Sequence, residues 1–272
     1  MTNNQDEAAP AGIDTSLPHS ARIYDYWLGG SSNFAVDRSL GQTFEEAIPS
    51  IRTMARENRR FLGRAVRYMA GEAGLRQFLD VGTGVPADGD TPSVTGIVAP
   101  DSRVVCVDND PIVQAHARTL TANSSDGRTV YLQGDLREPE RLLEDPVLTR
   151  HLDLDQPVGL LLVAVLMLVG DEHEPVDNVR TLLDALPPGS HVAVTHPSQD
   201  FDEQAMAEIV ATAGRGRMTL VPRRRDEVKA FFGDWELVRP GLVPVMGWRP
   251  EEAAPQDPNA AYYWGGVARK PA

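Results

Sequence analysis

The sequence predicts a doubly wound α/β fold, with a mostly parallel sheet that carries helices on both faces. Short continuous apolar runs, of the type buried on both faces of a parallel sheet, alternate along the chain with helical stretches. Several of these stretches begin with a capping residue followed by proline, which suits a first helical turn because that turn leaves its N–H groups unpaired. Five such units, joined by right-handed crossovers, build an open sheet between two layers of helices.

The elements follow one another in a regular order. The predicted strands are Gln77–Val81, Arg103–Val107, Thr129–Gln133, Val158–Leu166 and Ser190–Thr195. The predicted helices run from Pro49 to about Met69, then over Ser93–Ala99, Ile112–Leu120, Pro139–His151 with a potential break at Pro146, Val176–Leu186, Phe201–Ala213 and Arg224–Phe232. Two last strand candidates, WELVRPGLVPV and YYWGGVARK, are separated by the loop RPEEAAPQDPNA and predict a hairpin at one edge of the sheet.

The chain divides into three parts. Residues 1–16 are polar and acidic, which predicts a flexible tail. Residues 17–74 are predicted to form a helical arm and a further helix that cover a ligand site, and residues 75–272 the Rossmann-like domain. The arm, SLPHSARIYDYWLGGSSNFAVDR, places three aromatic residues and a Gly-Gly pair in a segment of low periodicity, and this composition is unlike that of a linker.

Composition narrows the classes of function. The 272 residues carry a formal net charge of −13, which argues against a general nucleic-acid binder because phosphate contacts need a positive face. No apolar run reaches the ~20 residues that cross a bilayer, and the start of the chain lacks the apolar segment of a secretion signal. With a single cysteine, Cys106, in an apolar run, these features predict a cytoplasmic protein without membrane contact. The five arginines between Arg215 and Arg225 fit a solvated surface better than a site for an anionic partner.

One stretch, QFLDVGTGVPADGD at positions 77–90, permits two interpretations. From Gly82 it spells G-x-G-x-x-A, which resembles a dinucleotide-binding loop; from Asp80 it spells D-x-G-x-G, which resembles a loop that holds S-adenosylmethionine (SAM). A pyrophosphate is anionic and binds over glycines at a helix start, whereas SAM carries a sulfonium cation and an ammonium group. The acids around the turn, Asp80, Asp88 and Asp90, therefore favour SAM.

Acidic residues also follow the next two predicted strands. Asp108 ends the second strand, where the ribose hydroxyls of either cofactor would be held. Asp135 follows the third strand, where it could accept a hydrogen bond from an adenine amino group while Leu136 packs on the ring. Each acid by itself could instead cap a helix. Three acids at consecutive strand ends, Asp80 included, indicate a ligand site at one edge of the sheet.

Six segments together resemble a family of SAM-dependent methyltransferases from actinobacteria that bears an N-terminal YDYxLGG arm. The segments are ARIYDYWLGGSSNFAVDR, RQFLDVGTGVP, VVCVDNDPIV, GDLREPE, LLLVAVLMLV and VKAFFGDWELVRPGLVPV. The family is similar to class I methyltransferases, so the resemblance implies a seven-stranded sheet with an antiparallel last strand, SAM as cofactor and S-adenosylhomocysteine (SAH) as product. The implied contacts are Gly82, Thr83 and Gly84 with the methionine end of SAM, Asp108 and Asn109 with its ribose, Asp135 and Leu136 with its adenine, and Ala164 and Val165 as the floor.

The arm also permits two interpretations. It could fold over the cofactor, with the rings of Tyr24, Tyr26 and Trp27 facing the cationic sulfonium, an attraction of about 0.5–2 kcal/mol. In that case Arg22 would pair with the methionine carboxylate and Asn33 would supply a polar contact. Alternatively, the aromatic side chains could clasp an edge of the domain and bury area against the helix after Pro49.

The sequence supports a general base less strongly than it supports the cofactor site. His196 follows the fifth strand and is the first candidate, because a histidine titrates near neutral pH; it could equally cap the loop that follows. His173 lies among three acids, but without a second histidine nearby it fits a solvated loop better than a metal site, and no metal is predicted.

The leading hypothesis is a SAM-dependent methyltransferase that acts on a small-molecule acceptor. Two alternatives remain open at this point. One is an NAD(P)-linked oxidoreductase on a similar α/β core, and the other is a SAM-binding regulator without catalytic activity, because a fold does not imply an activity. The sequence identifies neither the acceptor nor the oligomeric state.

Overall fold

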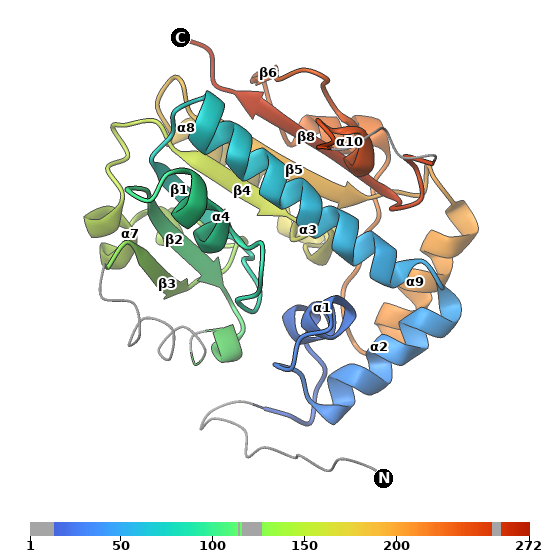
Figure 1. The fold of residues 1–272 in the computed structure, drawn as a ribbon. Helices are drawn as coiled ribbons and strands as arrows, with labels where there is room; N and C mark the ends of the chain where they lie inside the picture. The colour runs from blue at the N-terminus through green and yellow to red at the C-terminus, as the bar shows by residue number, and fades with distance from the viewer. Residues whose placement is uncertain (1–13, 114, 116–126, 252–256) are drawn as a thin grey trace.

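A computed structural model describes residues 14–113, 115, 127–251 and 257–272 of the chain (Figure 1). The helices are α1 (Ser20–Leu28), α2 (Ala35–Ala47), α3 (Ile51–Arg67), α4 (Thr91–Val98), α6 (Pro139–Leu143), α7 (Pro146–His151), α8 (Pro175–Asp184), α9 (Glu203–Arg215) and α10 (Arg225–Ala230). The strands are β1 (Gln77–Val81), β2 (Arg103–Asp108), β3 (Thr129–Gln133), β4 (Gly159–Val163), β5 (His191–Pro197), β6 (Glu236–Leu237), β7 (Val243–Pro244) and β8 (Tyr263–Arg269). Most of the predicted tail and most of the predicted helix Ile112–Leu120 lie outside the described residues.

The sheet has the strand order β3-β2-β1-β4-β5-β8-β6. Strands β1 to β5 pair in parallel, and β8 pairs antiparallel with β5, which confirms the predicted doubly wound sheet and its antiparallel last strand. The strand predicted over WELVRPGLVPV is not continuous. Its ends, β6 and β7, both pair with β8, because the chain turns between them at Gly241, which has a φ of 97°.

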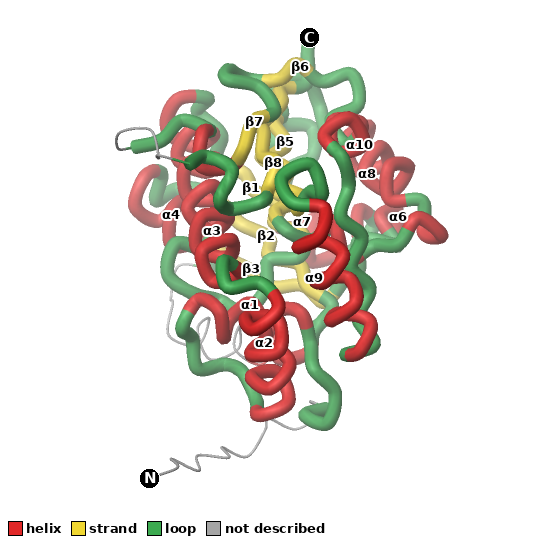
Figure 2. Tube along the Cα trace, turned by 90° about the vertical axis from the view of Figure 1, so that its right-hand side faces the viewer, coloured by secondary structure: helices red, strands yellow, loops and turns green. Residues whose placement is uncertain are grey.

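Each strand sends alternate side chains into two apolar layers, as the two-residue period of a strand requires. In β1, Phe78 packs in the layer that contains the apolar faces of α3, α4 and α9, whereas Leu79 packs in the layer of α6, α7, α8 and α10. Figure 2 shows α3 and α4 on one side of the sheet and α6, α8 and α10 on the other. Both faces of the central strands are therefore buried, which explains their continuous apolar sequence.

The fourth strand is shorter than the apolar run predicts. It ends at Val163, and Ala164 takes a left-handed conformation with a φ of 56° before a short 3-10 turn over Leu166–Leu168. The residues after the strand stay largely apolar because they pack beside the sheet, so hydrophobicity alone does not mark the strand end. The helix predicted over Pro139–His151 does divide at Pro146, where Asp145 caps α7.

The arm is helical, as predicted, but the N-terminal part contains one helix that the sequence does not predict. The arm contains α1, and a helix that was not predicted, α2, follows it before α3. Helix α3 continues through a π-helical turn over Tyr68–Glu72, and the chain then turns at Gly74, which has a φ of 75°. Figure 1 shows α1 and α2 beyond the end of the sheet toward which the strand arrows point, and α3 lying along one face of the sheet.

Three smaller predictions have outcomes in the described part of the chain. No helix there is long and apolar enough to span a membrane. Cys106 is a buried free thiol, as predicted. Four of the five arginines between Arg215 and Arg225 are exposed, as predicted, whereas Arg223 is buried and forms an ion pair with Asp171.

Candidate functional site

A cavity of about 210 Å³ lies where the parallel strands β1 to β4 end and the N-terminal helices cover them. From the sheet edge it is lined by Asp80, Gly82, Thr83, Gly84, Asp108, Asn109, Asp135, Leu136, Ala164 and Val165, so all ten residues predicted at this edge line one cavity. They meet because β3, β2, β1 and β4 are neighbours in the sheet and parallel strands end at the same edge.

The glycine loop after β1 turns in a way that only glycine allows. Gly82 has a φ of 76°, and its backbone N–H and that of Thr83 donate to the carbonyl of Val107. A Cβ on Gly82 would stand 2.3 Å from Cγ2 of Val165. Gly84 also has a positive φ, 73°, but a Cβ there would meet nothing within 4 Å. The first glycine is thus required for packing against the floor of the cavity, and the second for the turn.

Asp80 is a buried carboxylate at the start of this loop. It accepts hydrogen bonds from the hydroxyls of Thr91, at 2.6 Å, and Thr83, at 3.2 Å. Burial raises the pKa of Asp80 to about 6, against the lowering effect of the Thr91 hydroxyl and of nearby Arg59. Helix α4 begins at Thr91, two residues before the predicted start at Ser93, and Asp90 caps it by accepting from the N–H of Ser93 at 2.9 Å.

The other two acids hold the loops at the ends of β2 and β3. Asp108 accepts from the backbone N–H groups of Gly84, at 2.8 Å, and Asp110, at 2.9 Å, and burial raises its pKa. Asp135 forms an ion pair with Arg137 and accepts from the Asn109 amide at 3.2 Å. The hydrogen bonds from Arg137 lower the pKa of Asp135 to about 2, so this carboxylate stays ionised.

The arm lines the opposite wall through one face of α1. Ser20, Ile23, Tyr24 and Trp27 recur at three- and four-residue spacing and all line the cavity. The Tyr24 hydroxyl donates to the carbonyl of Ala55 at 2.9 Å, which fastens this face to α3. Two of the five arm residues predicted to contact the cofactor, Tyr24 and Trp27, therefore lie at the cavity.

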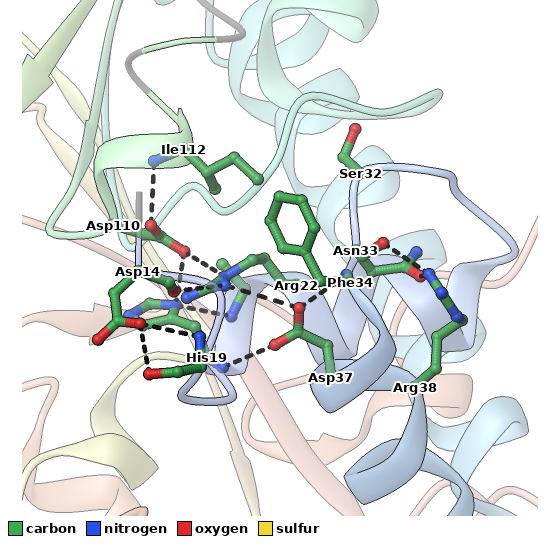
Figure 3. Close-up of polar contacts among 12 residues, drawn as sticks. Asp14, His19, Arg22, Ser32, Asn33, Phe34, Asp37, Arg38, Asp110 and Ile112 are labelled. Atoms are coloured by element: carbon green, nitrogen blue, oxygen red, sulfur yellow. Dashed lines mark hydrogen bonds and ion pairs between the residues drawn. The ribbon is translucent and has the colours of Figure 1, made fainter. Parts of the chain in front are cut away.

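The other three predicted arm contacts do not reach it. Arg22 is buried between Asp110, whose Oδ2 is 3.1 Å from its Nε, and Asp37, at 3.7 Å, as Figure 3 shows. Tyr26 packs under the guanidinium of Arg52, 4.6 Å from the ring centroid. Asn33 donates to Asp25 at 2.8 Å and to the carbonyl of Gly30 at 3.0 Å. These side chains dock the arm, and the structure does not support the predicted pairing of Arg22 with a cofactor carboxylate.

His196 is not among the residues that line the cavity. The side chain is completely buried, with Nδ1 2.9 Å from the carbonyl of Pro197 and Nε2 3.2 Å from Arg223. Burial, together with the charge of Arg223, lowers the pKa of His196 to about 3, so the ring is neutral near pH 7. The predicted role as a base is not supported, because the buried ring does not face the cavity lining and is already held by Pro197 and Arg223.

Further residues line the cavity from α3 and from the loops beyond β4 and α9, and the sequence did not predict them. Asn58, Arg59 and Leu62 line the cavity from α3, and Met167, Leu168, Met218 and Leu220 from the loops. Asn58 carries a detectable signal, because it stands in an otherwise apolar helical stripe. The loop residues carry none, since they are ordinary apolar side chains whose place at the cavity depends on how the loops pack.

These groups fit an adenosyl amino acid better than a dinucleotide. Carboxylates stand at three strand ends, where a cation and hydroxyl groups can be held, and the close packing of Gly82 on Val165 leaves the backbone as the surface of the turn. Asn58 Oδ1 is buried without a hydrogen-bond partner in the described part of the chain, so the cavity also has an unused acceptor for an N–H group. Phosphates would meet acids at each of these positions.

Comparison with known proteins decides between the two cofactors. Residues 6–271 match the family described as S-adenosyl methyltransferase. The chain belongs to this family. It is a SAM-dependent methyltransferase, with SAM as its cofactor and SAH as the product. No curated protein matches the chain.

Two solved structures are similar over the whole methyltransferase. One is a DUF574 family protein from Streptomyces avermitilis, with 39% identity over 95% of this chain and 100% of that one, and a TM-score of 0.91. The other, from Thermobifida fusca and proposed to be a methyltransferase, has 37% identity over 98% and 100% of the two chains, and a TM-score of 0.91. Magnesium protoporphyrin IX methyltransferase from Synechocystis, solved with SAH, is 13% identical over 91% and 93% of the two chains, with a TM-score of 0.54, and shares the fold.

Proposed function

We propose that this methyltransferase binds SAM in the cavity between the sheet edge and α1, and transfers its methyl group to a small-molecule acceptor there. The observation that supports this most directly is the convergence of Asp80, Asp108 and Asp135 with the glycine loop in one cavity. We assign Gly82, Thr83 and Gly84 to the methionine end, Asp108 and Asn109 to the ribose, and Asp135 and Leu136 to the adenine, over a floor of Ala164 and Val165.

Each assignment has a local chemical reason. Asp108 presents a buried carboxylate that can accept hydrogen bonds from two neighbouring hydroxyls. Asp135 is held ionised by Arg137, so it can accept from an adenine amino group, while Leu136 offers an apolar surface to the ring. Asp80 lies where an ammonium group would complete its hydrogen bonding, beside the hydroxyls of Thr83 and Thr91.

Bound SAM would supply an electrophilic methyl group: a nucleophilic atom of the acceptor would bond to the methyl carbon in line as the carbon–sulfur bond breaks, and SAH would be the leaving group. The protein would hold SAM and the acceptor in position and exclude water from the site. The turn at Gly82 packs closely against Val165 in the floor of the cavity, and Tyr24 and Trp27 line the opposite wall. Holding two reactants in line is a large part of what a transfer of this type requires. We assign no general base, because no histidine is among the described residues that line the cavity.

The acceptor is proposed to be small and largely apolar. Besides the acids and the glycine loop, the cavity is lined by the apolar side chains of Ile23, Phe44, Leu62, Met167, Met218 and Leu220, and methionine side chains adapt to ligands of irregular shape. That related proteins of this family carry the same YDYxLGG arm stays a prediction, as does the cytoplasmic location.

Calorimetric titration of the protein with SAM, SAH and NAD tests the cofactor assignment. Binding of SAM and SAH without NAD is expected, and binding of NAD alone would contradict it. Incubation with radiolabelled methyl-SAM and fractionated metabolites then tests catalysis. Transfer of label to a small organic product is expected, whereas tight SAH binding with no transfer to any fraction would favour the SAM-binding regulator.

A further inference from the structure

The cavity contains two positively charged side chains among its described lining residues, Arg59 and Arg137. They differ in what they already bind. Arg137 donates to both carboxylate oxygens of Asp135, and this pair closes the adenine end. Arg59 forms no ion pair and no hydrogen bond with any residue that the structure describes, and its guanidinium lies over the ring of Tyr24, 5.6 Å from the centroid. Only Arg59 is therefore ready to pair with an anionic group of a ligand.

Arg59 lies at the end of the cavity that the glycine loop forms. It is half-buried on the face of α3 that meets the loop after β1, where its Cγ lies 3.9 Å from the place of a Cβ on Gly89. Its charge also acts on Asp80 and lowers the pKa that burial has raised. Arg59 and Asp80 thus face the same volume with opposite charges, as the carboxylate and ammonium of an amino acid would require.

The preceding residue on α3 adds an uncharged acceptor beside this guanidinium. Asn58 is 1% exposed, and its Nδ2 donates to the Tyr24 hydroxyl at 2.9 Å. This bond fixes the amide, and its Oδ1 is left without a partner in the described part of the chain. An unpaired buried acceptor costs free energy, which a donor N–H on a ligand would recover.

We propose that Arg59 binds the carboxylate of the methionine moiety of SAM and SAH, and that Asn58 Oδ1 accepts a hydrogen bond from the neighbouring ammonium group. This inference rests on the proposed SAM site and assigns its amino-acid end. Arg59 thereby takes the role that the sequence analysis gave to Arg22, which is already neutralised by Asp110 and Asp37.

A pair of ligands isolates this contact. SAH and 5′-methylthioadenosine share the adenosine and the thioether sulfur, but methylthioadenosine lacks the amino-acid group. By calorimetry, Arg59→Gln should weaken SAH binding by roughly 10- to 100-fold, the range expected for one charge-assisted hydrogen-bonded pair. Methylthioadenosine should change by less than about twofold, because it has no carboxylate to lose.

Two further variants control the comparison. Arg60→Gln removes the next arginine of α3, whose side chain is 70% exposed and pairs with Glu57, and should leave both affinities unchanged. Arg59→Lys keeps the charge without the planar fork, so SAH affinity should fall between those of the wild type and Arg59→Gln. Thermal unfolding of each variant reports whether it is folded.

The results distinguish an error in the role of Arg59 from an error in the SAM site itself. If Arg59→Gln weakens both ligands by the same factor, or neither, Arg59 does not bind the amino-acid carboxylate and the inference is overturned. If the wild-type protein binds neither ligand, the proposed SAM site itself is wrong, and the inference fails with it. A selective loss of SAH affinity in Arg59→Gln supports the assignment.

Discussion

The two walls of the cavity are built on different kinds of element. On the sheet side, Asp80, Asp108 and Asp135 stand at the ends of neighbouring parallel strands, and all three face the cavity. On the helical side, residues that are close in sequence separate. Tyr24 lines the cavity, whereas Arg22, two residues earlier on α1, points into a cluster of acids behind the wall. A strand end places its residue through topology, but a helix places it through its rotation about its own axis.

The two walls also differ in how their polar side chains are used. The sheet side offers groups that can contact a ligand directly, while most polar groups of the arm are used for docking. Arg22 pairs with Asp110, whose backbone N–H donates to Asp108, and Asp108 in turn accepts from Gly84. Arg22 is therefore a positioning residue that acts on the sheet side through two carboxylates, as Figure 3 shows for its own ion pairs.

The largest expected effect comes from breaking this connection. Arg22→Ala leaves Asp37 and Asp110 buried without the guanidinium, so the free energy of unfolding in urea should fall by about 3–5 kcal/mol. SAH and methylthioadenosine should lose affinity by a similar factor, because the effect passes through the ribose loop. Arg180→Ala, which removes an exposed pair with Asp177, should have little effect on either measurement. Selective loss of SAH binding would instead place Arg22 at the methionine end.

The next largest effect tests the sheet side. Gly82→Ala places a Cβ 2.3 Å from Val165 at a φ of 76°, so left-handed strain and overpacking together should cost about 2–5 kcal/mol of unfolding free energy. Gly84→Ala has the same positive φ without the close neighbour and should cost only about 1–2 kcal/mol. Chemical denaturation and SAH titration of both variants measure the difference. Equal losses would mean that Val165 moves aside freely.

A smaller effect is expected for His196, which belongs to neither wall. His196→Gln removes a buried ring that is hydrogen-bonded to Pro197 and Arg223, so stability should fall by about 1–3 kcal/mol. The affinity for SAH, measured at a temperature where the variant is folded, should stay within about twofold of the wild type. A stable variant that binds SAH but no longer transfers methyl groups would restore the predicted base.

The smallest effect is a dependence on pH at the sheet side. Burial raises the pKa of Asp80 to about 6, so this carboxyl is half protonated at about that pH and mostly protonated below it. An ammonium group prefers the ionised form. SAH affinity should therefore increase as the pH rises through about 6 and level off above it, with a loss of about fivefold between pH 6 and pH 5. Asp80→Asn should remove this slope in calorimetric titrations between pH 5 and about 8, and a slope that persists would point to another group.

Much of the sheet side could be predicted from the sequence. The strands, the presence of α4 and the three acids follow from local patterns, and parallel strands bring their ends to one edge whatever their exact order. The arm was harder, because its aromatic residues fit a lid and a clasp equally well. Asn58 was visible as a polar residue in an apolar stripe, but the stripe alone does not tell a buried structural amide from a cavity residue.

What the sequence by itself determined is the fold class, the glycine turn and the charge of the sheet edge, because these depend on residues near one another in the chain and on the period of a strand. Only the tertiary structure decided which arginine faces the cavity. Arg22 is neutralised by Asp37 and by Asp110, 88 positions away, whereas Arg59 is left without an anionic partner among the described residues. The ion pairs of a side chain depend on which distant elements pack against it, and no local pattern records them.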